Sequence, residues 1–400
     1  MKKIFYILWG IAIILGSIGV AQRFMYGHEP AAYGNRVVWG LWVAMYIYFV
    51  GISAGAFLFS SLVYVFRIKM FEKVGKLALI TALVTLVCGL LSIWFDLGHM
   101  WRAYTVMTRP NFSSMMAWMI WLYAAYSILL LLETFLVFKI DSGKHTGEVL
   151  EKYRKRLKLY AIIGIPLAIA FSGGVGALFG VVSANPMWHS ALTPIFFVVG
   201  AVASGVALFT MLFAFFWENK KSTYYKEMIN VLAKIVLIAV LFDLLLEWAE
   251  LSIALWMGTP AHTAGFKEML FGNYWYVFWI FHLLFGVIVP VWILATKKDP
   301  IKIGIASLLV VFTFIGVRLN IVIPGLVAEK MHGQALAYIH PRLAYSYFPS
   351  MMEWLVGIFI VAFGIGLFYL GIKYLNLTKD NNAVGIKNPK LTKENNAVNA

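Results

Sequence analysis

The feature that most constrains this chain is a succession of long apolar runs separated by short polar connections. A run of about 18 or more apolar residues is long enough to cross a bilayer as a helix. Within lipid, every backbone polar group needs an internal partner, so helices are the expected structure. The sequence therefore predicts an all-α, polytopic integral membrane protein with about ten transmembrane helices. The expected spans are residues 4–21, 37–66, 74–97, 114–139, 158–183, 190–217, 230–257, 272–295, 301–322 and 352–375.

The formal net charge of +15 is explained by membrane topology. Of the 33 Lys and Arg residues, 24 lie at the N-terminus, in the tail, or in and beside the loops after spans 2, 4, 6 and 8, whereas 8 lie in or beside the other loops. Loops rich in Lys and Arg stay on the cytoplasmic side, and "EKYRKRLK" at 151–158 is the strongest marker. We therefore expect both termini in the cytoplasm, a location in the cell's inner (cytoplasmic) membrane, contact with membrane lipid, and no nucleic-acid partner.

The two ends of the chain differ in character. "MKK" followed by an apolar stretch is also typical of a cleaved signal peptide, but the run is long for one, which favours a retained first helix. The polar tail at 376–400 contains "LTKDNNAV" and "LTKENNAV" and is expected to be disordered and cytoplasmic. The predicted integral membrane domain is 1–375.

An internal similarity suggests a duplication. "SAGAFL" at 53–58 and "ASGVAL" at 203–208 lie 150 residues apart, each in an even-numbered span. At a similar offset, Asp96 corresponds roughly to Glu247, and Glu133 to His282. The first match is also what close helix contacts produce by chance. We expect two four-helix units, about 37–183 and 190–322, with two flanking helices.

Ionisable residues gather at the predicted outer rim. "FDLGHMWRAY" at 95–104 ends the third span, and on a continuing helix Asp96, His99 and Arg102 share one broad face. Gly98 offers the alternative that the helix ends early and the three residues line a loop. Arg109 precedes a proline and is expected in an extended segment.

Further polar residues are expected in the second half and at greater depth. Charges within the bilayer cost a few kcal/mol and usually face a partner or a water-filled path, although charges near helix ends also serve as interfacial anchors. The candidates for a second polar site at the outer level are His189, Glu247, Glu250 and Arg318. The candidates for a deeper proton path are Glu133, Asp243 and His282, for which neutral buried hydrogen-bonding groups are the alternative.

The numbers of histidine and cysteine residues limit which cofactors this chain can bind. A bis-histidine haem needs two histidines at membrane depth, and only His282 is expected there. The single cysteine, Cys88, excludes an iron–sulfur cluster or a cysteine-based zinc site within this chain, and we predict no metal site. A secondary transporter of a small solute or ion is the alternative, because repeats and midplane charges are typical of transporters.

A quinone site fits the pattern better than a transporter. Oxidation of a quinol releases two electrons and two protons, so the site needs hydrogen-bond partners, a base, and access from lipid. The ionisable groups at one rim of an apolar bundle supply these. Asp96, His99 and Arg102 are the Asp, His and Arg side chains at this rim.

Several segments together resemble one family. "FDLGHMWRAYTVMTRPNFSSMMAW" is similar to the D-L-G…R…RPN..S.M.W segment of the membrane subunits of the polysulfide-reductase, or NrfD-like, family. "WGLWVAMYIYFVGISAGAF", "NPMWHSALTPIFFVVGAVASGVAL", "RLNIVI" and "YSYFPSMMEWLVGIFIVAFGI" agree in order and spacing. The ten-span length most resembles the branch that includes HybB and DsrP. His99 stands where many relatives have arginine.

The resemblance implies a role and partners. It implies a haem-free, quinone-reactive subunit that uses menaquinone or ubiquinone as substrate and is not active alone. It also implies an extracytoplasmic, ferredoxin-like iron–sulfur partner subunit and a catalytic or cytochrome subunit. The quinone site implied by the resemblance lies at the outer rim of the first four-helix unit. In this chain the resemblance points to Asp96 and His99 as proton-accepting groups. It implies that Arg102, Tyr104 and Arg109 are further quinone-binding residues.

Overall fold

The structure is a computed structural model that describes residues 2–66, 68, 70–71, 74–142, 145–331, 333–337, 340, 343–375 and 377. Its described part contains ten helices long and apolar enough to span a membrane, which confirms the predicted all-α polytopic fold. The expected tail at 376–400 lies outside the described residues, apart from Leu377.

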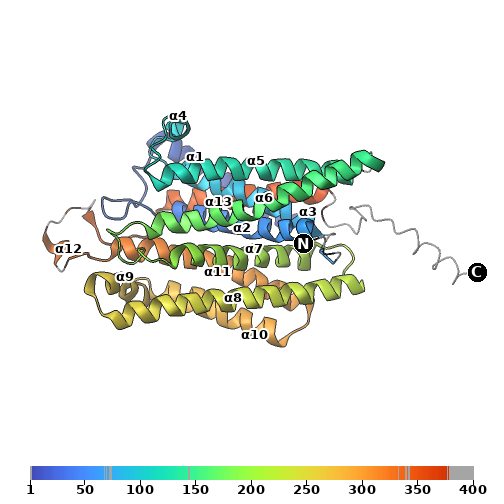
Figure 1. Ribbon diagram of the computed structural model, residues 1–400. Coiled ribbons are helices and arrows are strands. Elements are labelled where there is room, and N and C mark those ends of the chain that lie inside the picture. Colours follow the sequence, from blue (N-terminus) through green and yellow to red (C-terminus); the bar gives the residue numbers. More distant parts are fainter. Residues whose placement is uncertain are drawn as a thin grey trace, which may run out of the picture.

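The ten spanning helices lie roughly parallel in one elongated bundle (Figure 1). They are α1 (Lys2–Tyr26), α2 (Leu41–Phe66), α3 (Gly75–Asp96), α5 (Met115–Asp141), α6 (Gly147–Gly180), α7 (Thr193–Phe216), α8 (Thr223–Met257), the π-helix η3 (Val277–Ile288) continued by α10 (Val289–Thr296), α11 (Pro300–Val327) and α13 (Met351–Leu375). Shorter helices occupy the connections: η2 (Met100–Arg102), α4 (Thr105–Thr108), α9 (Pro260–Phe271) and α12 (Gln334–Ala337).

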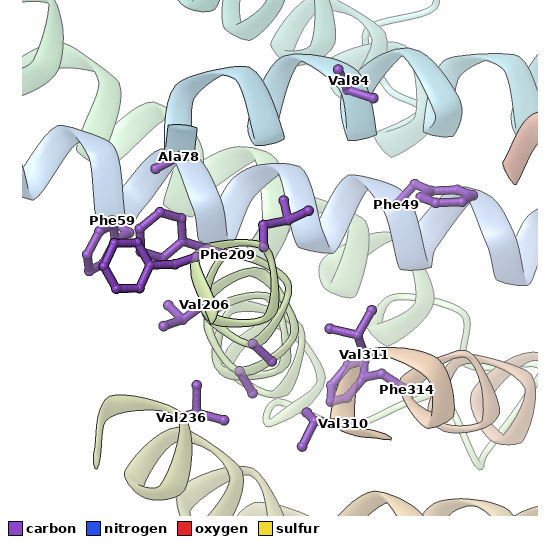
Figure 2. Close-up of a cluster of buried hydrophobic side chains, with 14 of the residues drawn as sticks. Phe49, Phe59, Ala78, Val84, Val206, Phe209, Val236, Val310, Val311 and Phe314 are labelled. Atoms are coloured by element: carbon purple, nitrogen blue, oxygen red, sulfur yellow. The ribbon is translucent and has the colours of Figure 1, made fainter. Parts of the chain in front are cut away.

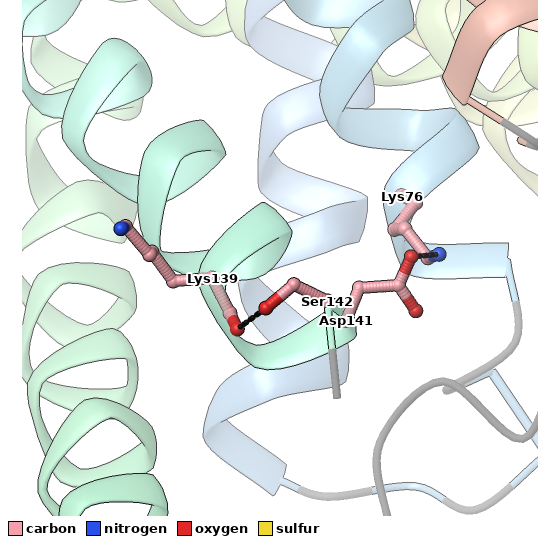
Figure 3. Close-up of polar contacts among 4 residues, drawn as sticks. All are labelled: Lys76, Lys139, Asp141 and Ser142. Carbon is pink, nitrogen blue, oxygen red and sulfur yellow. Dashed lines mark hydrogen bonds and ion pairs between the residues drawn. The ribbon is translucent and has the colours of Figure 1, made fainter. Parts of the chain in front are cut away.

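The two ends of the bundle are distinct. The short helices α4, α9 and α12 all lie at one end, on the left in Figure 1, and the N-terminus lies at the other. We call these the α9 end and the N-terminal end. At the N-terminal end, Lys76 at the start of α3 forms an ion pair with Asp141 at the end of α5 (Figure 3). Beside it, the Ser142 hydroxyl donates a 2.8 Å hydrogen bond to the carbonyl of Lys139.

Several helices extend further than the sequence prediction, and α6 and α11 are the two that change an interpretation. Helix α6 begins at Gly147, eleven residues before the expected start, so the basic segment 151–158 is helical. Its Glu, Lys, Arg and Leu residues are strong helix formers, which let the helix continue beyond its apolar part. Helix α11 continues past Arg318 to Val327, with Pro324 inside it. Arg318 therefore lies within the helix rather than at its end.

Helices α2 and α7 form the centre of the bundle and cross at their small residues. A Cβ on Gly55 of α2 would lie 1.9 Å from the carbonyl oxygen of Ala201, and one on Gly205 of α7 would lie 2.6 Å from the nitrogen of Ala56. The two similar segments of the sequence thus pack directly against each other, as small residues allow. The grouping of the spanning helices into two four-helix units remains a prediction.

Apolar side chains fill the space around this crossing. In Figure 2, Phe59 of α2 lies beside Phe209 of α7, and their ring centroids are 4.8 Å apart. Val206, Val236 and Val310 bring α7, α8 and α11 into the same buried cluster. On the outside, α1 packs along α13.

Candidate functional site

The segment that begins at Asp96 leaves the helix at once. Helix α3 ends at Asp96, and Leu97 is extended, with φ −63° and ψ 129°. Asp96, His99 and Arg102 therefore do not share a face of one continuous helix. The alternative prediction, that the helix ends early, is the correct one. His99, Arg102, Tyr104 and Arg109 are exposed at the α9 end, whereas Asp96 is partly buried.

Asp96 is held by a tyrosine that the sequence pattern did not indicate. The Tyr33 hydroxyl donates a 2.8 Å hydrogen bond to Oδ1 of Asp96. Desolvation first, and then the charge of Asp96, raises the pKa of the Tyr33 phenol well above its ordinary value. The phenol therefore keeps its proton and stays a donor to the carboxylate.

An arginine fixes the backbone on either side of Asp96. Nε of Arg23 donates to the carbonyl of Phe95 at 2.8 Å, and its Nη2 donates to the carbonyl of Leu97 at 2.6 Å. Nη2 of Arg23 also donates to Nε2 of His28 at 3.1 Å. Burial, followed by the charge of Arg23, lowers the pKa of His28, so this imidazole is neutral at neutral pH and accepts that bond. A positive charge is thus fixed beside Asp96.

A second carboxylate, Glu353, ties this region to α13. It is fully buried and accepts hydrogen bonds from the backbone nitrogens of Ala32 at 2.9 Å and Ser350 at 3.1 Å, and from the hydroxyl of Tyr347. The Tyr347 hydroxyl also accepts from the nitrogen of Leu41 at 2.7 Å. Both carboxylate oxygens thus have donors, so the group is stable without a basic partner.

Aromatic rings enclose these polar groups. Tyr33 lies between Trp42, in an edge-to-face contact at 6.0 Å, and Tyr347, in a stacked contact at 6.3 Å. The guanidinium carbon of Arg23 lies 5.8 Å from the centre of the Trp42 ring. We call Arg23, His28, Tyr33, Trp42, Asp96, Tyr347 and Glu353 the rim cluster.

Sequence reasoning found Asp96 but missed Arg23, His28, Tyr33 and Tyr347. These residues lie at the end of the first span and in the two long outer connections, far apart in the sequence. The run "QRFMYGHEPAAY" at 22–33, with ionisable side chains and two tyrosines directly after an apolar span, was the available signal. It gave no indication that these residues meet Asp96.

The second half of the chain contains a cavity. It has a volume of about 90 Å³ at the α9 end, between α7, α8, α9 and α11. Its walls are mostly apolar and aromatic, including Trp188, Phe197 and Phe266, and Glu247 and Glu250 face it. Glu250 accepts a 3.0 Å hydrogen bond from the hydroxyl of Ser190.

Behind the cavity, four ionisable side chains lie close together. Oε2 of Glu247 and Nε2 of His282 share a hydrogen bond of 2.8 Å. His282 lies in the π-helix η3. Such segments are rare in proteins, and many of those known occur at functional sites. Asp243 and Arg318 are buried next to them, and a Cβ on Gly200 would lie 3.3 Å from Oδ1 of Asp243 and 3.0 Å from Nη2 of Arg318.

The remaining candidates lie apart from these groups. His189 is exposed, and its Nδ1 donates a 2.7 Å hydrogen bond to the carbonyl of Gly180. Glu133 is fully buried on α5, which packs against α3, α4 and α6. Helix α8, which carries Asp243, packs against α7, α9, α10 and α11. The structure thus brings Asp243, Glu247, His282 and Arg318 together, and leaves Glu133 in the other half of the bundle.

Fold and site together define a class of protein: a multi-pass helical membrane protein with a rim cluster at one end and a separate buried ionic cluster in its second half. Residues 30–328 match the family model described as "Polysulphide reductase, NrfD". The chain belongs to this family, as the resemblance in its sequence indicated.

Three relatives show how far the similarity extends. A selenate reductase subunit of Mesobacillus selenatarsenatis is 35% identical, over 91% of this chain and 93% of its own length. The "Hdr-like menaquinol oxidoreductase integral membrane subunit" of Archaeoglobus fulgidus is 28% identical, over 93% and 94%. The "Menaquinone reductase, integral membrane subunit" of Nitratidesulfovibrio vulgaris is 25% identical, over 84% and 82%. These relatives are subunits of reductase or oxidoreductase complexes.

Proposed function

We propose that this chain is the haem-free, quinone-reactive membrane subunit of a multi-subunit oxidoreductase. It exchanges electrons between a menaquinone or ubiquinone pool and an extracytoplasmic iron–sulfur subunit. Family membership and the quinone chemistry in the names of two relatives support this role. The observation that carries it is the Asp96 carboxylate at the end of α3, fixed by Tyr33 at the edge of an apolar bundle.

The rim cluster has the groups that quinol oxidation requires. Asp96 is partly exposed and accepts a proton from the quinol hydroxyl, acting as the general base. Tyr33 orients the carboxylate by donating to one of its oxygens, and Arg23 fixes a positive charge beside it.

The loop after Asp96 supplies the remaining proposed contacts. His99 acts as a second proton acceptor, and Arg102, Tyr104 and Arg109 bind the quinone head from the exposed side. All four side chains are exposed at the α9 end and are available to a molecule that arrives from the lipid or from a partner surface.

The partner subunits follow from the electron route. Electrons that leave a quinol need a redox centre, and we propose that a ferredoxin-like iron–sulfur subunit supplies it and passes them to a catalytic or cytochrome subunit. The chain has one cysteine, and of its eight histidines only His282 is expected at membrane depth, so we propose that it holds neither haem nor an iron–sulfur cluster. We place the α9 end outside the inner membrane and both termini in the cytoplasm, because Lys and Arg are concentrated at the N-terminal end.

Substitution of Asp96 tests the proposed site. Asp96→Asn keeps the size of the side chain and removes its ability to accept a proton, so quinol oxidation by the assembled complex should fall by roughly 10²–10⁴-fold. Asp299→Asn is the matched control, because Asp299 caps α11 at the opposite end and asparagine caps a helix equally well. Assembly is scored in parallel. Near-normal turnover of an assembled Asp96→Asn complex would refute the assignment of the base.

A further inference from the structure

The cavity of the second half leads to a line of ionisable side chains that points into the bundle. Asp243, Glu247 and Glu250 occupy one face of α8 at spacings of four and three residues. Glu250 and Glu247 face the cavity. A volume of about 90 Å³ exceeds the roughly 10–15 Å³ that a single water needs, so the cavity accommodates several waters beside two carboxylates.

The next step inward is the pair of Glu247 and His282. The 2.8 Å hydrogen bond between Oε2 and Nε2 is short enough for proton transfer. His282 is 3% exposed, and its second ring nitrogen, Nδ1, has no hydrogen-bond partner in the described part of the chain. An imidazole that receives a proton at Nε2 can release a different proton from Nδ1. The unpartnered Nδ1 is therefore the atom from which a proton would leave His282.

A small space lies on that side of the imidazole. Its volume is about 10 Å³, and its lining includes His282, Asp243 and Thr313. Oδ1 of Asp243 is likewise buried without a hydrogen-bond partner among the described residues, and Asp243 is 5% exposed. A space of roughly one water with three polar neighbours is a favourable site for a buried water. A water in this space would connect Nδ1 of His282 to Asp243.

The row of ionisable side chains that begins at the cavity ends at Arg318. This guanidinium is fully buried, and within the described part of the chain none of its three nitrogens has a hydrogen-bond partner. Its carbon lies 4.7 Å from the centre of the Phe197 ring and 5.0 Å from that of Phe314. Gly200 leaves room between Nη2 of Arg318 and Oδ1 of Asp243. A buried cation stabilises a carboxylate beside it, so Asp243 is a suitable end point for a proton that moves in and out.

An apolar layer separates Asp243 from the N-terminal end. The buried residues of α8 between Tyr225 and Asp243 are all apolar, and Val236 and Val240 are among them. In Figure 2, Val236 lies near Val206 of α7 and Val310 of α11. Among the described residues, the buried face of α8 between Tyr225 and Asp243 therefore carries no ionisable side chain that would connect Asp243 to the N-terminal end.

We propose that Glu250, Glu247, His282 and Asp243 form a proton half-channel that opens through the cavity at the α9 end. A proton passes from cavity water to Glu247, then to Nε2 of His282, while Nδ1 releases a proton through the bridging water to Asp243. The reverse sequence returns it, and the apolar layer prevents leakage to the other side. The half-channel is separate from the rim cluster, and its existence does not depend on the proposed quinone chemistry.

Cysteine accessibility tests whether the cavity holds water from the α9 end. In a Cys88→Ala background, Leu246→Cys places a thiol in the cavity wall, and Leu245→Cys places one on the exposed outer face of the same helix, one residue away. A small membrane-impermeant methanethiosulfonate is applied to each side of membranes that contain the whole complex. The thiol at 246 should react at least about tenfold faster than that at 245, and only from the α9 side. Equal rates, or reaction from the N-terminal side, would overturn the half-channel.

A carbodiimide tests the proton path itself, because it modifies carboxyl groups in their protonated form. In sealed vesicles, labelling of Asp243, mapped by mass spectrometry, should follow the pH on the α9 side and not the pH on the other side. Glu247→Gln keeps the hydrogen-bonding shape but cannot carry a proton, and should abolish this response while labelling of Glu133 is unchanged. Absence of labelling at Asp243, or a response that survives Glu247→Gln, would contradict the proposal. Neither outcome requires quinol turnover, so this test and that of Asp96 are independent.

Discussion

At the residue scale, two buried charged side chains show different solutions to burial. Glu353 is fully buried, and donors from three residues satisfy its carboxylate. Arg318 is fully buried between two aromatic rings, and its Nη2 and Oδ1 of Asp243 both lie close to the Cβ position of Gly200. A carboxylate with all its donors in place stabilises one structure, whereas a buried guanidinium without direct hydrogen bonds costs free energy unless water or a carboxylate satisfies it. Glu353 therefore has the environment of a structural residue, whereas we propose that Arg318 belongs to the half-channel.

Glu353→Gln should destabilise the protein. The amide keeps one acceptor oxygen but places an NH₂ group against donors that the carboxylate had accepted. An unsatisfied buried donor costs about 1–3 kcal/mol, so the thermal unfolding temperature of the purified protein in detergent should fall. Glu148→Gln, an exposed position in the first turn of α6, is the control and should change it little. Equal unfolding temperatures for the two variants would show that the hydrogen bonds of Glu353 do not stabilise the fold.

At the element scale, the apolar runs alone predicted the ten spanning helices, because their length and composition determine whether they cross a membrane. The site was less accessible to sequence reasoning. Asp96 was found since it ends an apolar run, but its partner Tyr33 lies 63 residues away. The π-helical form of Val277–Ile288 had no sequence signal, and it places His282 opposite Glu247. Periodicity predicts which element a residue occupies, whereas tertiary packing decides which side chains meet.

The crossing of α2 and α7 gives a prediction at this scale. In Gly55→Ala the new methyl group would overlap the carbonyl of Ala201, which is backbone and cannot move aside without separating the helices. The variant should lose folded protein in a fluorescence-detected size-exclusion assay. Gly10→Ala on α1 is the matched control, since nothing lies within 4 Å of its Cβ position. It should be neutral or stabilise by about 0.5–1 kcal/mol, because alanine is a better helix former. Normal folding of Gly55→Ala would contradict the close crossing.

At the scale of the whole molecule, the two ends of the bundle differ in the residues that they carry. The rim cluster, the cavity and the short helices α4 and α9 all belong to the α9 end, and the Lys-rich connections belong to the other end. This separation makes the orientation in the membrane a direct test of the proposed route for electrons and protons.

Thiol labelling in intact cells can establish the orientation. In the Cys88→Ala background, Gly98→Cys lies in the loop after α3, where nothing approaches its Cβ position, and Ser142→Cys lies at the exposed end of α5. An impermeant maleimide should label position 98 from outside and position 142 only after the membrane is opened. The reverse pattern would place the termini outside the cytoplasm and the proposed partner on the wrong side.

The exposed loop at the α9 end gives the last prediction, which concerns assembly. Trp101 is 73% exposed and Tyr104 is 66% exposed, and Arg102 and Arg109 are exposed beside them. Aromatic residues and arginine are enriched where proteins bind one another, and this combination supports the loop as the docking surface for the iron–sulfur subunit. Reversing both charges in Arg102→Glu/Arg109→Glu sets like charges against a complementary partner, which costs several kcal/mol, so co-purification of the partner should fall at least about tenfold. Lys220→Glu/Lys221→Glu makes the same change in charge at the N-terminal end and should leave co-purification intact. If both double variants kept the partner equally well, docking would have to occur elsewhere on the molecule.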